Sequence, residues 1–211
     1  MAGHPFSIRF DSVCGRVELP TFCKDAGVIE IRTLPPERID LLAEIDRSEH
    51  IEALYEATAG VLTRRRVAIE VPSWDTNGAG PHSVAGLVAE VQPVLERGAV
   101  LLGAFSGEDL AGIAVVEEGF EGTMAWLTLL HVSHPYRRRG VASALWDESI
   151  ARARLAGSRS MYVSATPSAS AVGFYLSRGC EVLAEPLPDL FAKEPEDIHL
   201  IYQIVKTTQL G

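Results

Sequence analysis

Three consecutive arginines and a glycine, Arg137 to Gly140, are the part of the sequence best suited to chemistry with an anion. Guanidinium groups attract phosphate oxygens and hydrogen-bond them. Glycine adopts backbone conformations that other residues avoid, so a phosphate can approach the main chain closely. If a helix begins after this glycine, its first N–H groups are unpaired and its N-terminus carries a partial positive charge. The turn therefore predicts a phosphate-binding site.

The segments on either side of this turn have the patterns of a strand and a helix. Residues 126–132 are apolar, β-prone and free of Gly and Pro, which is typical of a strand buried on both faces. After Gly140, small and apolar residues recur at helical spacing and predict one buried face. The expected face contains Ala142, Leu145, Trp146, Ser149, Ile150 and Ala153.

The spacing around the turn resembles the acetyl-coenzyme A signature of the GNAT superfamily of N-acetyltransferases. The matching residues are Arg137-x-x-Gly140-x-Ala142, after a strand that ends in Leu130-x-Val132. No Gly-Lys-Ser/Thr follows, so the turn is not a Walker loop, and Gly-x-Gly-x-x-Gly is absent from it.

A second motif downstream is similar to the superfamily's Asn-x-x-Ala-x-x-Phe-Tyr helix. Here it reads Ser168-x-x-Ala171-x-x-Phe174-Tyr175-x-x-x-Gly179, with serine in place of the usual asparagine. The two motifs stand in the superfamily's order and at a normal separation. The resemblance covers residues 99–183 and extends more loosely back to Val28.

This resemblance implies the GNAT fold, of class α/β (α+β). The expected sheet is central, mixed and mostly antiparallel, flanked by helices and splayed between its fourth and fifth strands. Residues 28–211 would form the acetyltransferase domain, and residues 1–27 an N-terminal extension that is a hairpin or a packing arm. The extension could instead make a dimer contact or form a flap over the substrate, and a homodimer is a further expectation.

The resemblance also implies acetyl-CoA as cosubstrate. The backbone around Leu130 to Val132 would hold the pantetheine arm and direct an N–H group at the thioester oxygen, where it would stabilise an oxyanion. The pyrophosphate would lie on the N–H groups of residues 138–143. The implied coenzyme contacts are Leu130, Val132, Arg137, Arg138, Arg139, Gly140, Val141, Ala142, Ser143, Ser168 and Phe174.

For the reaction, the resemblance implies that Tyr175 is the general acid that protonates the leaving thiolate. The candidates for the base are Glu117, Glu118, His131 and a water chain that ends at any of them, and of these we name Glu117 and His131. We therefore expect an acyltransferase that acetylates a primary amine of a small molecule or peptide by direct attack in a ternary complex. The alternatives are a CoA-binding sensor and a structural subunit with little turnover, which the serine at position 168 allows.

Composition excludes several other functions. The chain of 211 residues has a net charge of −9, which argues against a nucleic-acid partner. No apolar run is long enough for a membrane span, and no signal-peptide pattern is present at the start. Cys14, Cys23 and Cys180 are odd in number and lack metal-type spacing, so we expect reduced thiols, no metal and a cytoplasmic protein.

The remaining segments predict the elements around these motifs. The expected strands are 28–33, 67–71, 99–105, 110–117, 161–165, 180–183 and 198–205, with 6–10 and 15–19 as a hairpin in the extension. The expected helices are one from Pro36 to Ile45, a second short one with Ile51, Leu54 and Tyr55, and one from Val84 to Leu95 that Pro93 kinks or divides. Residues 185–197 read as a Pro-rich acidic loop.

Three groups of acidic residues are expected to converge beside the acceptor. They are Asp46, Glu49 and Glu52, then Glu117, Glu118 and Glu121, and finally Glu194, Glu196 and Asp197. A negative pocket would favour a cationic acceptor. The alternative is that these are ordinary surface carboxylates of an acidic protein.

Overall fold

The computed structural model describes residues 28–204. The predicted extension 1–27, with its hairpin, Cys14 and Cys23, lies outside the described residues. No helix within 28–204 is long and apolar enough to cross a membrane.

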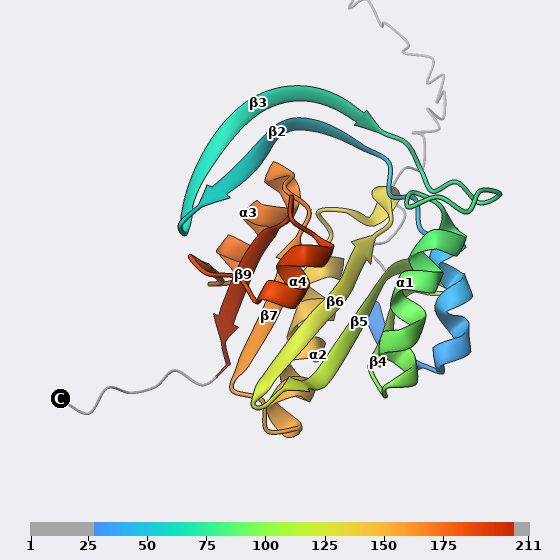
Figure 1. Cartoon of the computed structure of the whole chain (residues 1–211). Helices are drawn as coiled ribbons and strands as arrows, with labels where there is room; N and C mark the ends of the chain where they lie inside the picture. Colours follow the sequence, from blue (N-terminus) through green and yellow to red (C-terminus); the bar gives the residue numbers. More distant parts are fainter. Residues whose placement is uncertain (1–27, 205–211) are drawn as a thin grey trace, which may run out of the picture.

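A seven-stranded sheet forms the centre of the molecule, in the order β1-β4-β5-β6-β7-β9-β8 (Figure 1). Its strands are β1 (Ile29–Leu34), β4 (Val100–Ser106), β5 (Asp109–Glu121), β6 (Met124–Val132), β7 (Ser160–Ala165), β8 (Glu181–Val182) and β9 (Ile198–Gln203). All neighbours are antiparallel except β6 and β7, which are parallel. The predicted mixed, mostly antiparallel sheet is confirmed.

Strands β6 and β7, the fourth and fifth in the sheet, pair over only part of their length. Their register runs from Met124 opposite Ser160 to Leu127 opposite Val163, and no pairing follows among the described residues. The next residue, Thr128, is a bulge, because Val116 lies opposite Leu127 while Val115 lies opposite Leu129. An inserted residue bends its strand and ends regular pairing. The predicted splay is therefore confirmed, and it opens at the bulge.

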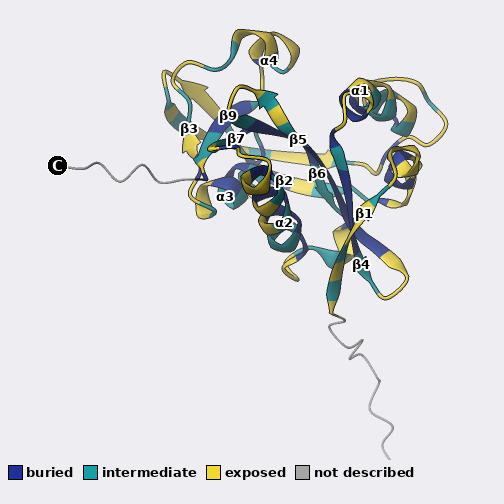
Figure 2. Ribbon diagram, turned by 90° about the horizontal axis from the view of Figure 1, so that it is seen from below, coloured by how far each residue is buried: buried dark blue, intermediate teal, exposed yellow. Residues whose placement is uncertain are grey.

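Helices cover both faces of this sheet and enclose two cores (Figure 2). One face carries α2 (Val141–Leu155) and α3 (Ala169–Ser177); the other carries η1 (Pro36–Glu44), α1 (Val84–Glu96) and α4 (Pro188–Lys193). The predicted buried face of α2 is correct at five positions from Leu145 to Ala153, while Val141 replaces Ala142 as its first buried residue. Gly112 lets α2 approach the sheet, because a Cβ there would lie 2.9 Å from Val141 Cγ1.

The prediction of a second short helix around Ile51 to Tyr55 is wrong. These residues lie in β2 (Glu49–Thr58), which pairs antiparallel with β3 (Val61–Val71) as a separate two-stranded sheet. The hairpin arches over the splayed end of the main sheet (Figure 1). Ala59 and Gly60 both have positive φ, 48° and 79°, which is the backbone geometry of a tight hairpin turn. Pairing with a strand further along the chain outweighs the helix-forming tendency of the local sequence.

Four smaller expectations are also corrected. The helix that begins at Pro36 is a 3-10 helix, and α1 is not divided at Pro93. The predicted acidic loop 185–197 contains α4, which begins at Pro188, a residue preorganised for the first turn of a helix. The strand expected over 67–71 is longer and starts at Val61.

Candidate functional site

The basic turn after β6 has the backbone of an anion-binding site. Gly140 has a φ of 83° and caps α2, and Arg138 also has a positive φ of 61°. No hydrogen bond to another described residue is made by the N–H groups of residues 138–143. A Cβ on Gly140 would have no heavy atom within 4 Å, so the space over the turn is open. The predicted N–H groups are therefore available to a phosphate.

The three arginines of the turn do not all face that space. Arg137 donates from Nε to the Val132 carbonyl at 3.2 Å and from Nη2 to the Arg47 carbonyl at 3.0 Å. Its side chain thus braces the end of β6, and its backbone N–H donates to the His134 carbonyl at 3.2 Å. Its expected contact with the coenzyme stays a prediction. Arg138 and Arg139 are exposed, and the Arg139 guanidinium lies 5.7 Å from the centre of the Tyr136 ring. These two cations remain free to attract an anion.

The end of β6 supplies an unpaired strand edge next to the turn. Leu130 lies opposite Ala114 and Val132 opposite Gly112, so β5 satisfies one edge of β6. The other edge has no described partner beyond Leu127. Free backbone groups along that edge can hydrogen-bond an extended chain as a neighbouring strand would. This is where the pantetheine arm was expected.

Ser168 caps α3. Its hydroxyl accepts a hydrogen bond from the Ala171 N–H at 3.3 Å and contacts Ser170 Oγ at 2.9 Å, and the residue is 3% exposed. Serine is a strong N-cap residue, as asparagine is. The substitution therefore keeps the start of the helix intact, and no coenzyme contact is needed to explain it. Phe174, by contrast, is half-buried and packs edge-on to Trp146.

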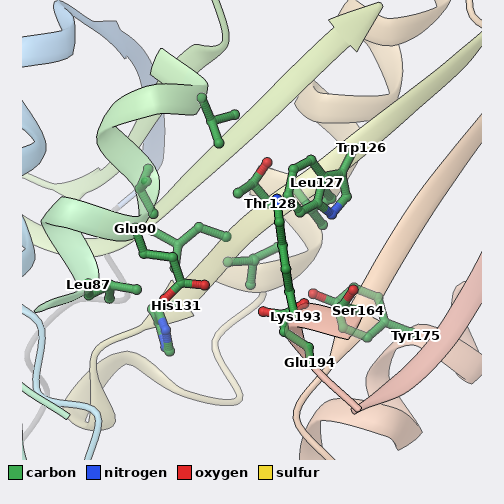
Figure 3. Close-up of a pocket in the computed structure, with 14 residues that line it drawn as sticks. Leu87, Glu90, Trp126, Leu127, Thr128, His131, Ser164, Tyr175, Lys193 and Glu194 are labelled. Carbon is green, nitrogen blue, oxygen red and sulfur yellow. The ribbon is translucent and has the colours of Figure 1, made fainter. Parts of the chain in front are cut away.

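A cavity of about 170 Å³ lies on the α1 side of the splay (Figure 3). Its walls come from four elements, α1, β6, β7 and α4, with Tyr175 from α3 at its edge. The lining residues are Leu87, Glu90, Val91, Val94, Trp126, Leu127, Thr128, Leu129, Leu130, His131, Ser164, Tyr175, Lys193 and Glu194. We call this cavity the cleft.

Tyr175 is 7% exposed and lines the cleft. Burial raises the pKa of its hydroxyl, and the nearby acidic groups Cys180 and Asp197 add to the shift. The phenol therefore stays protonated throughout the neutral range. A protonated hydroxyl at the edge of the cleft is suited to donate a proton there.

The two predicted bases differ in position. His131 lines the cleft, with its ring edge-on to Trp74 at 5.3 Å between centroids. Burial, together with the positive charges of Arg47 and Arg137, lowers its pKa to about 4, so the imidazole is neutral at pH 7. Glu117 does not line the cleft. Both of its carboxylate oxygens accept hydrogen bonds from Arg97, at 3.0 and 2.8 Å.

The three acidic groups do not converge as a whole. Glu49 contacts Arg137 and Ser170, and Glu118 lies 4.0 Å from Arg152 Nη1. Of the nine residues, Glu194 lines the cleft, while Glu196 and Asp197 line a second cavity of about 620 Å³ beneath the hairpin. The three groups therefore do not converge on one cavity, and Glu194 is the only one of the nine residues that lines the cleft.

The carboxyl groups of Asp197 and Glu194 both have raised pKa values. Burial raises the pKa of Asp197 to about 7, and the nearby carboxylates Glu194, Glu90 and Glu196 add to the shift. Burial also raises the pKa of Glu194, while Ser164 and Lys193 lower it.

The sequence did not indicate three residues of the cleft: Glu90, Ser164 and Lys193. Each comes from a different element, and none belongs to a motif. In the sequence, each of the three is only a polar residue next to apolar ones, which does not by itself indicate a site. Within residues 28–204, no three His, Cys, Asp or Glu side chains are grouped to hold a metal ion.

Several solved structures of acetyltransferases have the same fold as this chain. The chain is similar to nourseothricin acetyltransferase, with a TM-score of 0.59 and 20% identity over 84% of this chain and 99% of that one. It is also similar to a putative streptothricin acetyltransferase from Bacillus anthracis in complex with acetyl coenzyme A, with a TM-score of 0.53 and 16% identity over 84% and 97% of the two chains.

A third similar structure is the ribosomal-protein-S18-alanine N-acetyltransferase from Escherichia coli. It has a TM-score of 0.55 and 14% identity over 87% of this chain and 98% of that one. At these identities the likeness establishes the fold, and a comparison with curated proteins finds no match. A family model for acetyltransferases of the GNAT family matches residues 74–180, just over half of the chain and including both motifs. This chain therefore belongs to the GNAT acetyltransferase family, whose reaction is acetyl transfer from acetyl-CoA.

Proposed function

We propose that this protein transfers the acetyl group of acetyl-CoA to a primary amine of a small molecule or peptide. One observation carries the proposal. An open anion-binding turn and a buried, protonated tyrosine lie at two ends of the same splay between β6 and β7. A coenzyme held by its pyrophosphate at the first end would bring its thioester to the second.

The residues present fit acetyl-CoA. The N–H groups of 138–143 have no described partner, and the φ of Gly140 places the main chain where a side chain would be strained. The free edge of β6 beyond Leu127 can take the amide groups of the pantetheine arm. A backbone N–H near the Thr128 bulge would then donate to the thioester oxygen and stabilise its negative charge.

Tyr175 supplies the proton in this proposal. The amine nitrogen bonds to the thioester carbon, the carbon–sulfur bond breaks, and the phenol donates its proton to the departing sulfur. The high pKa of Tyr175 keeps the proton in place until the sulfur becomes basic. Its hydroxyl makes no hydrogen bond to another described residue, so its proton is free to point towards the coenzyme.

The amine must lose a proton before it attacks, since a lysine-like amine has a pKa of roughly 10. His131 lines the cleft and is neutral, so its imidazole can accept that proton through water. Its low pKa makes it a weak base, and a water relay to solvent shares this role. Glu117 is not proposed as the base, because Arg97 holds both of its oxygens outside the cleft.

The proposal is tested by turnover. Purified protein is incubated with acetyl-CoA and a panel of alkylamines, amino sugars and peptides, and both free CoA thiol and the mass of each amine are measured. We expect one acetylated amine for each CoA released. Coenzyme binding without acetylation of any amine in a broad panel would contradict the proposal and favour a CoA-binding sensor.

A further inference from the structure

The side chain of Lys193 lies in the cleft. It extends from the end of α4 towards β6, and Nζ is 5.8 Å from the centre of the Trp126 ring (Figure 3). A cation at this distance from an indole face is attracted by the ring. The molecule therefore places one of its own alkylammonium groups in the pocket beside the reaction centre.

The surroundings of Trp126 suit such a group. The indole is 6% exposed and packs against Phe120 at 5.0 Å between ring centres, so its position is fixed. Two carboxylates from different elements, Glu90 on α1 and Glu194 at the end of α4, line the same cleft. An aromatic face, apolar walls and two carboxylates are the groups that bind an alkylammonium ion.

The position of Trp126 shows which part of an acceptor would lie there. Trp126 lies opposite Tyr162, where β6 and β7 are still paired. The coenzyme arm can enter only past Leu127, where the pairing ends. Trp126 and the Thr128 bulge are two residues apart, which is about 6–7 Å along a strand. A cation over Trp126 is thus beyond the reach of the thioester, and it is a second group of the acceptor.

We propose that Trp126, Glu90 and Glu194 form a subsite for a second cationic group of the acceptor, and that Lys193 occupies this subsite when no acceptor is bound. This inference rests on the proposed function and names its substrate class, which is an amine with a second ammonium group a few carbons from the first. Lys193 competes with that group for the indole face. An incoming diamine displaces it.

The experiment compares two acceptors of equal length. Cadaverine has an amine at each end of a five-carbon chain, and n-pentylamine has only one. For the wild-type protein we expect kcat/KM to be about tenfold or more higher for cadaverine, from one cation–π contact and its carboxylate partners. The advantage should shrink at high salt.

Variants assign the preference to the subsite. Trp126→Leu and Glu194→Gln should bring the ratio of the two kcat/KM values close to one, while Trp126→Phe keeps part of it. Lys193→Met keeps the length of the side chain but removes its charge, so it should raise kcat/KM for cadaverine. Glu185→Gln is the control for Glu194→Gln. It removes a negative charge from the exposed loop before α4 and should leave the ratio of the two kcat/KM values unchanged.

Each failure has its own meaning. If no amine is acetylated by the wild-type protein, the proposed function fails, and calorimetric titration of cadaverine into the coenzyme-free protein still tests the subsite. If amines are acetylated without a preference for cadaverine, or if Glu194→Gln leaves the preference intact, the subsite is wrong. A fall in cadaverine turnover in Lys193→Met would also overturn it. Glu194→Gln changes one charge and keeps the shape of the side chain. It therefore still tests the subsite if Trp126→Leu does not fold.

Discussion

The two ends of the splay between β6 and β7 are built in different ways. The proposed coenzyme end is made by the main chain of one continuous segment, residues 132–143. Within it the N–H groups of 138–143 make no hydrogen bond to another described residue, and the space over Gly140 is open. The proposed acceptor end, the cleft, is made by side chains from α1, β6, β7, α3 and α4.

This difference has a physical reason. A pyrophosphate is recognised by backbone N–H groups and a glycine conformation, which a short run of residues fixes by itself. An amine acceptor is recognised by charges and apolar surfaces, which any element can supply once the fold brings them together. Changes at the coenzyme end should therefore alter binding of acetyl-CoA, and changes at the acceptor end should alter turnover.

The largest effect is expected at Tyr175. Tyr175→Phe keeps the buried ring and removes the proton donor, so kcat should fall by about 10²-fold or more while the Kd for acetyl-CoA changes little. Steady-state kinetics and calorimetric titration measure the two quantities. Wild-type kcat in this variant would mean that the tyrosine only packs against Trp146.

The second-largest effect is expected at Gly140, in the proposed phosphate-binding turn. Gly140→Val should weaken CoA binding by about tenfold or more, because a branched side chain would stand where the phosphate approaches. The measurement is the rise in Tm on adding CoA. Gly157→Val is the matched control, since Gly157 has a φ of 89° and equally open surroundings at the other end of α2.

Both substitutions impose the same backbone strain, so both should lower the Tm of the free protein. Only Gly140→Val should lose the response to CoA. An equal loss in both variants would show that strain, and not the phosphate site, explains the result.

A smaller effect is expected in stability near Asp197. The folded protein keeps this carboxyl protonated up to a pH of about 7, whereas its ordinary pKa is 3.8. The folded state thus binds more protons between these values, and stability falls as pH rises from about 4 to 7. Asp197→Asn should remove this decline and stabilise the protein at pH 8 by about 1–2 kcal/mol, a reduced figure because the side chain retains contact with solvent.

Urea unfolding at pH 5 and pH 8 measures this difference. The gain should be full at pH 8 and about a third as large at pH 5, because pH 5 lies only slightly above the ordinary pKa of the carboxyl. An equal gain at both values would mean that Asp197→Asn acts through packing and not through ionisation.

The smallest effect is expected at Glu117. Glu117→Gln weakens an ion pair with Arg97 that is partly open to water, so it should cost at most about 1 kcal/mol and leave kcat within about twofold. His131→Asn, inside the cleft, should lower kcat by about tenfold. The pair of variants compares the two predicted bases directly. A larger loss of kcat in Glu117→Gln than in His131→Asn would reverse their assignment.

The sequence predicts well the elements that depend on the spacing of neighbouring apolar residues or on a single glycine. The strand 126–132 and the buried face of α2 follow from apolar spacing, and the phosphate turn follows from Gly140. The hairpin was missed because Glu49 to Thr58 resembles a helix locally, and its partner strand lies beyond a turn, Ala59-Gly60, without the usual Asn-Gly signal.

The acceptor end could not be predicted for a related reason. Glu90 and Lys193 are far apart in sequence and meet only because α1 and α4 pack on the same face of the sheet. Glu117 looked suitable as a base, but its pairing with Arg97 at the end of α1 is a tertiary contact. Tyr175 is identified through its motif and lines the cleft, while its role as the acid stays a prediction.

The central claim is that the coenzyme lies along the free edge of β6, from the turn after Val132 to the cleft. Hydrogen exchange with and without CoA, read by mass spectrometry, tests this most directly. We predict that CoA slows exchange at residues 138–143 and at 128–132, and leaves the β2–β3 hairpin tip unchanged. Protection confined to other segments, with 138–143 exchanging as fast as in the free protein, would contradict the account.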